Sequence, residues 1–216
     1  MATPKLRTLA HLAEAIDAEL GWRKRELSYL NTAIGKTTSY AQAAQIRAAV
    51  ALLYAHWEGF VVACLRSYMS YVTQQRAQLS KLSPGLRVGA LLPPLRRVER
   101  ERAAAARVAL LLHYEEALGK TAELKGDRLV DAESNLNSVR FLGLVSCVGF
   151  DASPFEPLSK FLDESLVARR NAICHGEALD LDVAAYRSVE GNVISLMEQV
   201  KNAALDHAQN KKFLAK

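Results

Sequence analysis

The stretch from residue 40 to residue 79 contains no proline, and its apolar side chains recur at alternating spacings of three and four. That spacing places them along one face of an α-helix. At about 1.5 Å per residue the helix would be roughly 60 Å long, which exceeds the diameter of a small domain. Two arrangements are therefore open: part of the helix packs against another subunit, or the helix kinks near Gly59 and stays within one bundle. The apolar positions are Val50, Leu53, Trp57, Phe60, Val61, Cys64, Tyr68, Tyr71 and Val72.

Helical spacing recurs in the rest of the chain, and no segment shows the alternation typical of a β-strand. Further helices are expected at 5–33, 95–118, 134–148, 154–175 and 183–208. Ser153 is expected to cap the helix of 154–175, and Asp182 the last helix. Ser83–Gly85 and Pro93–Pro94 bracket an expected loop, and residues 210–216 are expected to fray. The sequence therefore predicts an all-α helical bundle with a long second helix, forming one domain over 1–216 in which 1–38 supplies the N-terminal helix.

Charge and cysteine content limit the classes of function. The formal net charge of +5 permits an acidic partner such as nucleic acid without requiring one. The three cysteines form no Cys-x-x-Cys pair, which predicts reduced thiols, no metal site and a cytoplasmic location. No cofactor motif is visible, so no cofactor is expected. The N-terminus has no apolar signal-peptide core and no stretch of about eighteen uninterrupted apolar residues occurs, so no membrane span is expected.

One segment concentrates basic charge: residues 87–107 carry six arginines and two glutamates. Such a segment could lie along a phosphate backbone. It could equally be the solvated face of a helix. The sequence leaves both interpretations open.

The segment that ends the helix of 154–175 combines residue types suited to catalysis. Asn171 and His175 are four residues apart and share a helix face, opposite the apolar stripe of the same helix. Arg170 and His175 are five apart, about 140° around an ideal helix. They converge only if the backbone leaves the helix near His175 or if a second chain supplies the missing half. Gly176 permits the first option, because glycine tolerates the left-handed conformation that ends many helices.

These residue types suit phosphodiester cleavage in RNA without a metal ion. Histidine can accept and return a proton near neutral pH. Arginine keeps its positive charge and can bind two phosphate oxygens. The 2′-hydroxyl that such a mechanism deprotonates is missing from DNA, which should resist cleavage. Arg-x4-His is by itself a weak motif, and a helix-ending histidine beside a solvated arginine remains an alternative.

The segment from Leu166 to Glu177 resembles the signature of the HEPN superfamily (higher eukaryotes and prokaryotes nucleotide-binding domain), whose nuclease members carry Arg-x(4–6)-His near a helix end. Tyr54–Val61 is similar to the long helix of a bacterial HEPN subfamily associated with toxin–antitoxin and defence loci. The similarity covers roughly residues 40–205. It implies a homodimer with a composite, metal-independent endoribonuclease site, an RNA substrate and a cognate antitoxin protein.

The resemblance also implies roles for individual residues. Arg170 would bind the scissile phosphate, His175 would transfer the proton, and Asn171 would orient His175 or the substrate. Arg169 also satisfies the spacing to His175, but the asparagine after Arg170 favours Arg170. Glu58 on the long helix could face the site and assist, or could be a surface or packing contact.

A related HEPN type carries, two places after the histidine, a tyrosine that accepts adenylate. The residue at that place is Glu177, so this form of control is not expected. Two other functions remain open: a non-catalytic HEPN module that binds RNA or a partner protein, and a helical assembly protein in which the motif only ends a helix.

Overall fold

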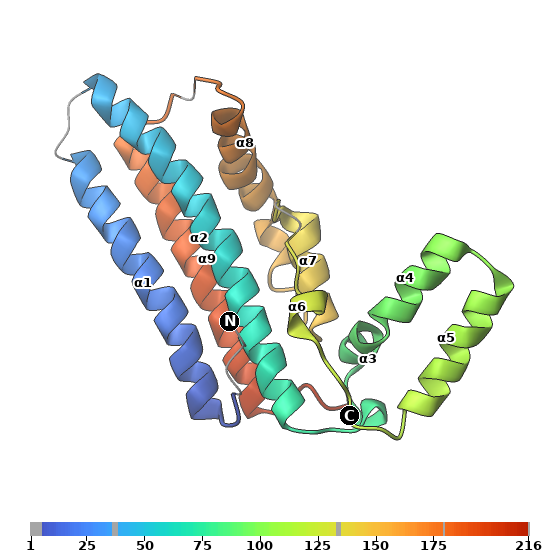
Figure 1. Cartoon of the computed structure of the whole chain (residues 1–216). Coiled ribbons are helices and arrows are strands. Elements are labelled where there is room, and N and C mark those ends of the chain that lie inside the picture. Colours follow the sequence, from blue (N-terminus) through green and yellow to red (C-terminus); the bar gives the residue numbers. More distant parts are fainter. Residues whose placement is uncertain (1–5, 36–38, 133–134, 179, 216) are drawn as a thin grey trace.

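The computed structural model describes residues 6–35, 39–132, 135–178 and 180–215, and these residues form helices and connecting loops without a β-strand (Figure 1). The prediction of an all-α chain is therefore confirmed. The α-helices are α1 Leu9–Gly35, α2 Ser39–Gln74, α3 Pro84–Ala90, α4 Leu92–Glu101, α5 Ala104–Ala117, α6 Gly126–Leu129, α7 Ser138–Cys147, α8 Ala168–Cys174 and α9 Val183–Gln209. Shorter segments are η1 Leu79–Lys81 and η2 Glu156–Leu158, both 3-10, and η3 Phe161–Val167, a π-helix.

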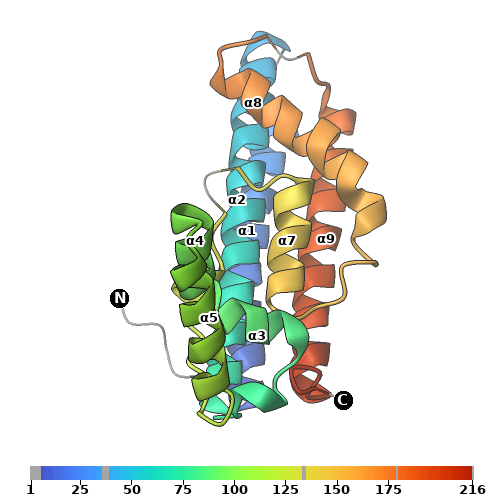
Figure 2. The same ribbon diagram turned by 90° about the vertical axis from the view of Figure 1, so that its right-hand side faces the viewer.

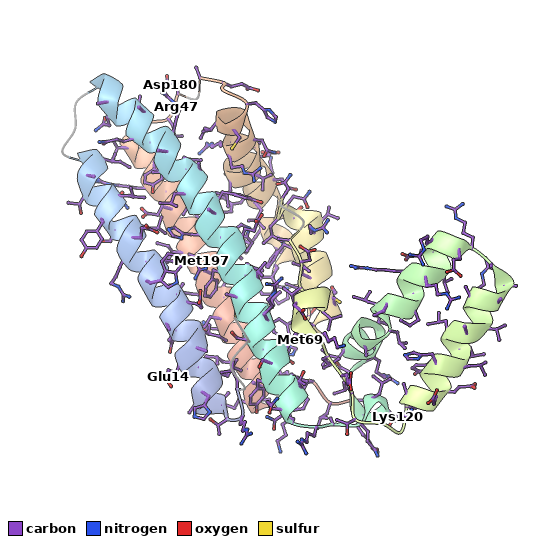
Figure 3. The ribbon with its side chains drawn as sticks, in the orientation of Figure 1. Glu14, Arg47, Met69, Lys120, Asp180 and Met197 are labelled. Atoms are coloured by element: carbon purple, nitrogen blue, oxygen red, sulfur yellow. The ribbon has the colours of Figure 1, made fainter. Side chains whose placement is uncertain are left out.

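The long helix α2 forms the centre of the bundle. It packs against α1 and α9 on one side and against α6, η3 and α8 on the other, as Figures 1 and 2 show from two directions. Trp57 and Tyr68 are fully buried on it. Met69 of α2 and Met197 of α9 are also fully buried, and Figure 3 marks both within the bundle. Burial of these apolar side chains supplies the main stabilising term.

Gly59 lies within the single helix α2, which runs through this position without interruption. Its lack of a side chain makes room for Arg23 of α1. A Cβ atom at position 59 would lie 3.1 Å from Nη2 of Arg23. Arg23 is only 6% exposed, and its Nη1 donates to the backbone oxygen of Glu19 at 2.7 Å. The glycine therefore permits close approach of α1 and α2, and the whole length of α2 is accommodated within one bundle.

The composition of α2 would also suit a membrane-spanning helix. An 18-residue window within Ala41–Gln74 has a mean hydropathy of 1.6, and 56% of that window is buried inside the protein. A core helix of a soluble protein passes the same test, so one such helix is weak evidence for a membrane. Packing against α1, α9 and α8 covers the buried part of this helix. The absence of a membrane partner stays a prediction.

A helical hairpin of α4 and α5, called the arm below, projects from the same side of the bundle as α7 and α8 (Figure 1). The expected loop at 83–94 is wrong, because Pro84 begins α3 and Pro93 and Pro94 lie in the first turn of α4. Proline suits a helix start, where its missing N–H leaves no bond unmade. The expected single helix of 95–118 is also interrupted, since Arg102 adopts φ 51° between α4 and α5.

The C-terminal segment after α9 is held in place, so the expectation of fraying is wrong for the described residues to 215. Phe213 is 3% exposed and packs edge-on against Tyr71, with ring centroids 6.3 Å apart. The backbone N–H of Ser83 donates to the carbonyl of Phe213 at 2.8 Å, and that of Ala215 donates to Lys81 at 2.8 Å. Phe213 thus anchors the segment after α9, whose other residues are mostly polar and would not by themselves hold it against the bundle.

Candidate active site

The candidate catalytic residues lie on α8, and the chain reaches them through three kinds of helical turn. The helix expected over 154–175 is continuous from 156 to 174, but it is not an α-helix throughout, because the 3-10 turn η2, the π-helix η3 and α8 follow one another. Ser153 does not cap this helix, because its hydroxyl donates to the Asp151 carboxylate at 2.8 Å. In a π-helix each turn takes more residues than in an α-helix, so η3 shifts which residues share a face. Π-helical turns occur frequently at functional sites.

The end of α8 is closed by the paired hydrogen bonds of a Schellman motif. The N–H of Glu177 donates to the carbonyl of Ala172 at 2.9 Å, and the N–H of Gly176 donates to Ile173 at 3.1 Å. Gly176 has φ +80°, and His175 has already left helical geometry at φ −88° and ψ 5°. The left-handed glycine predicted from the sequence is confirmed, and the backbone leaves the helix at His175.

Arg170 is held by two neighbouring side chains. Its guanidinium carbon lies 4.4 Å from the centroid of the Tyr54 ring on α2, in a cation–π arrangement. Its Nη1 donates to Oδ1 of Asn171 at 2.9 Å. Stacking and hydrogen bonding together restrict where the guanidinium can point. Sequence reasoning missed the role of Tyr54, because only the crossing of α2 and α8 brings the two residues together.

Glu58 reaches the same cluster through Tyr54. The Tyr54 hydroxyl donates to Oε2 of Glu58, one helical turn later. The N–H of Leu136 donates to the Tyr54 hydroxyl at 2.6 Å and approaches Oε2 of Glu58 at 3.3 Å. Burial, and then the hydrogen bond to Glu58, raise the pKa of Tyr54 far above its ordinary value. Tyr54 therefore stays protonated, and Glu58 fixes the ring on which Arg170 lies.

His175 is exposed at the end of α8, whereas Arg170 and Asn171 are half-buried. No hydrogen bond or ion pair to its imidazole occurs among the described residues. The contact between Asn171 and His175 is a backbone one, the His175 N–H donating to the Asn171 carbonyl at 2.9 Å. Asp180 marks the connection that follows, at the end of the bundle where α2 begins (Figure 3). The imidazole is thus open to a substrate or to another chain.

Comparison with known families gives one match, which spans most of the chain. A family model described as "HEPN_MAE_28990:/-like HEPN" matches residues 12–213. The chain belongs to this HEPN family. The comparisons matched no curated protein and no solved structure. HEPN domains are commonly ribonucleases.

Two arginines of this HEPN chain satisfy the spacing to His175, and the structure places them differently. Arg170 contacts Tyr54 and Asn171 as described. Arg169 buries its Nη1, for which no hydrogen-bond partner occurs among the described residues. Only Arg170 is brought together with Asn171 and the Tyr54–Glu58 pair. The assignment of catalytic roles to either residue stays a prediction.

Other polar groups in this HEPN domain lie elsewhere. His56 is 3% exposed and faces α1, with its Nε2 2.9 Å from Oε2 of Glu26. A cavity of about 720 Å³ lies between the arm and residues 120–131, and none of the α8 motif residues lines it. Within the described ranges no three His, Cys, Asp or Glu side chains are grouped as ligands for a metal ion.

Proposed function

We propose that this HEPN protein is a metal-independent endoribonuclease whose active site contains Arg170, Asn171 and His175. The observation that carries the proposal is the end of α8, where the Arg170 guanidinium contacts Tyr54 and Asn171 and the exposed His175 directly follows the helix. Family membership supports the reaction class. Tyr54 and Glu58 serve as positioning residues for Arg170.

In the proposed reaction the ribose 2′-oxygen attacks the adjacent phosphorus and the bond to the 5′-oxygen breaks. One histidine takes the proton from the 2′-hydroxyl, and a second acid returns a proton to the departing 5′-oxygen. Arg170 binds the phosphate oxygens, where negative charge increases in the transition state. The products are a 2′,3′-cyclic phosphate and a free 5′-hydroxyl. No metal ion or cofactor takes part in this scheme.

One chain offers one histidine at this site, so the proposal includes a homodimer. In it, His175 of each copy would supply one of the two proton transfers. The exposure of His175 and the chain reversal at Gly176 support this arrangement, because both leave the imidazole accessible from outside the chain. We further propose that the enzyme acts in the cytoplasm as the toxin or effector of a bacterial toxin–antitoxin or antiviral system, restrained by an antitoxin protein.

The test is cleavage of RNA by the purified protein in excess chelator, beside DNA of the same sequence. We expect RNA to be cut and DNA to remain intact. Arg170→Ala and His175→Ala should each abolish cleavage, because each removes a group that acts in the transition state. His11→Ala and Arg25→Ala are matched controls, since both replace exposed residues on α1, which lies across α2 from α8 (Figure 1).

The expected result requires that all four variants keep the wild-type circular dichroism spectrum and melting temperature. Cleavage that persisted in both α8 variants would overturn the proposed site. RNA binding without cleavage by the wild-type protein would instead indicate a non-catalytic HEPN module.

A further inference from the structure

The arm has almost no hydrophobic core of its own. No residue of α4 is buried, and Ala106 is the one buried residue of α5; every position of both helices is described. Helices of this length are marginally stable in water unless an apolar face is packed against something. The arm extends away from the bundle in Figure 1, and Figure 2 shows it from its outer side, in front of the bundle. The stability of α4 and α5 is therefore better explained if another protein surface packs against them.

The outer side of α5 carries an apolar stripe on the side of the helix opposite Ala106. Val108, Leu111 and Leu112 are 57%, 56% and 59% exposed. Their spacing of three and then one residue keeps them on one face, as in a helix that packs against another helix. Soluble chains rarely leave such a group uncovered. The stripe therefore indicates an interface.

The charges of α5 are arranged against its own dipole. Arg107 lies in the first turn, where the helix end is positive, and Glu115 and Glu116 lie near the negative C-terminal end. Glu116 is paired with Lys120 at 2.5 Å. Neither Arg107 nor Glu115 forms an ion pair with another described residue. An antiparallel second helix with the same sequence would compensate the unfavourable charge at both ends of α5. It would bring an acidic C-terminal end beside each basic N-terminal end.

We propose that α5 packs antiparallel against α5 of a second copy of this chain, so that two arms form a four-helix bundle. A two-fold axis at Leu111 would set Arg107 of each copy at the level of Glu115 of the other. The apolar stripes would then cover each other. In a two-fold interface both partners use the same surface, so that surface must be complementary to itself. An apolar stripe with a positive charge at one end and a negative charge at the other meets this requirement.

This interface goes beyond the proposed ribonuclease, since it uses none of the residues on α8. If the α8 ends also meet in a dimer, each chain has two separate two-fold contacts. Such a chain assembles into a closed tetramer or a longer filament. If the α8 ends do not meet, α5 alone gives a dimer.

The first experiment measures molar mass in solution by light scattering after gel filtration. We expect Leu111→Glu/Leu112→Glu to lower the mass of the wild-type assembly, to one half if that assembly is a dimer or a closed tetramer and to that of a dimer if it is a filament. Tyr29→Glu is the matched control, because Tyr29 is an exposed aromatic residue (77%) on α1. Helix α1 lies on the opposite side of the bundle from the arm (Figure 1). It should leave the mass unchanged. A monomeric wild type, or an unchanged mass in the arm variant, would overturn the proposal. This experiment measures molar mass and not RNA cleavage. Failure of the interface proposal is therefore distinguishable from failure of the proposed ribonuclease activity.

A charge exchange tests the register and does not depend on the apolar substitutions. Arg107→Glu and Glu115→Arg should each raise the dissociation constant by about tenfold, because each sets like charges face to face. The double variant Arg107→Glu/Glu115→Arg should return to within about threefold of the wild type, since the pair is restored with reversed signs. If the dissociation constant of the double variant rose by the product of the two single increases, without recovery, the antiparallel pairing would be contradicted.

Discussion

At the scale of single residues, Tyr54 determines where the Arg170 guanidinium lies. We expect Tyr54→Leu to lower RNA cleavage by about tenfold, because a cation–π contact of this kind contributes about 1–2 kcal/mol. Tyr54→Phe keeps the ring and should retain cleavage within about threefold. The measurement is the single-turnover rate at saturating protein. Equal losses in both variants would show that the hydroxyl, and not the ring, matters.

The sequence predicted some residues of the site and not others. Gly176 was identified as a possible helix end because glycine tolerates the left-handed conformation that ends many helices, and its φ of +80° confirms this. Tyr54 was not identified, because its contact with Arg170 joins two helices that are far apart in the chain. The hydrogen bond from Tyr54 to Glu58 follows from their spacing of four on a helix, which the sequence does show.

At the scale of elements, Gly85 fixes how closely α3 and α7 pack. A Cβ atom there would lie 2.5 Å from the carbonyl oxygen of Ser146 and 3.1 Å from Cα of Gly149. Gly85→Ala should therefore destabilise the protein by about 1–3 kcal/mol, although alanine favours helix. Urea unfolding followed by circular dichroism measures the change.

Gly143 provides the matched control for that substitution. It is exposed within α7, and a Cβ atom there would meet nothing within 4 Å. Gly143→Ala should stabilise the protein by about 0.5–1 kcal/mol, because alanine is the better helix former. If Gly85→Ala stabilised the protein as well, close packing of α3 on α7 would be disproved.

Helix starts and ends were predicted well where one side chain makes the capping bond. Asp182 was expected to cap the last helix, and its carboxylate accepts from the N–H of Ala185 at 2.7 Å. Ser153 failed as a cap because Asp151, two residues earlier, forms hydrogen bonds with it instead. The break at Arg102 could not be predicted from the sequence. Arg102 adopts a left-handed conformation, which is uncommon for a residue other than glycine.

At the scale of the whole molecule, helical periodicity was sufficient to predict an all-α bundle around one long helix. It was not sufficient to predict that the entire length of α2 would find partners within one chain. The reason is that α1 and α9 run along α2 for most of its length (Figure 1), and periodicity does not show which helices become neighbours. The projecting arm was missed for the same reason.

Two histidines, the buried His56 and the half-buried His207, should make the stability of the whole bundle depend on pH. Burial lowers the pKa of His56, although Glu26 partly opposes this. Burial and then Lys212 lower the pKa of His207, while Asp206 and Asp151 oppose them. An unfolded chain binds protons at histidine as the pH falls through about 6.5. The folded chain binds them only at lower pH, so the free energy of unfolding should fall between pH 7.5 and pH 5.5.

The contribution of one histidine can be isolated by substitution. His207 lies against Phe150, with ring centroids 4.4 Å apart, so phenylalanine should fill the same space. In His207→Phe the free energy of unfolding should change less between pH 7.5 and pH 5.5 than in the wild type. Burial raises the pKa of Glu190, which acts in the opposite direction, but both proteins retain that residue. His11→Gln, on an exposed position, should leave the pH dependence unchanged. Identical pH dependence in His207→Phe and the wild type would mean that His207 titrates alike in the folded and unfolded chains, and that its partial burial does not govern its charge.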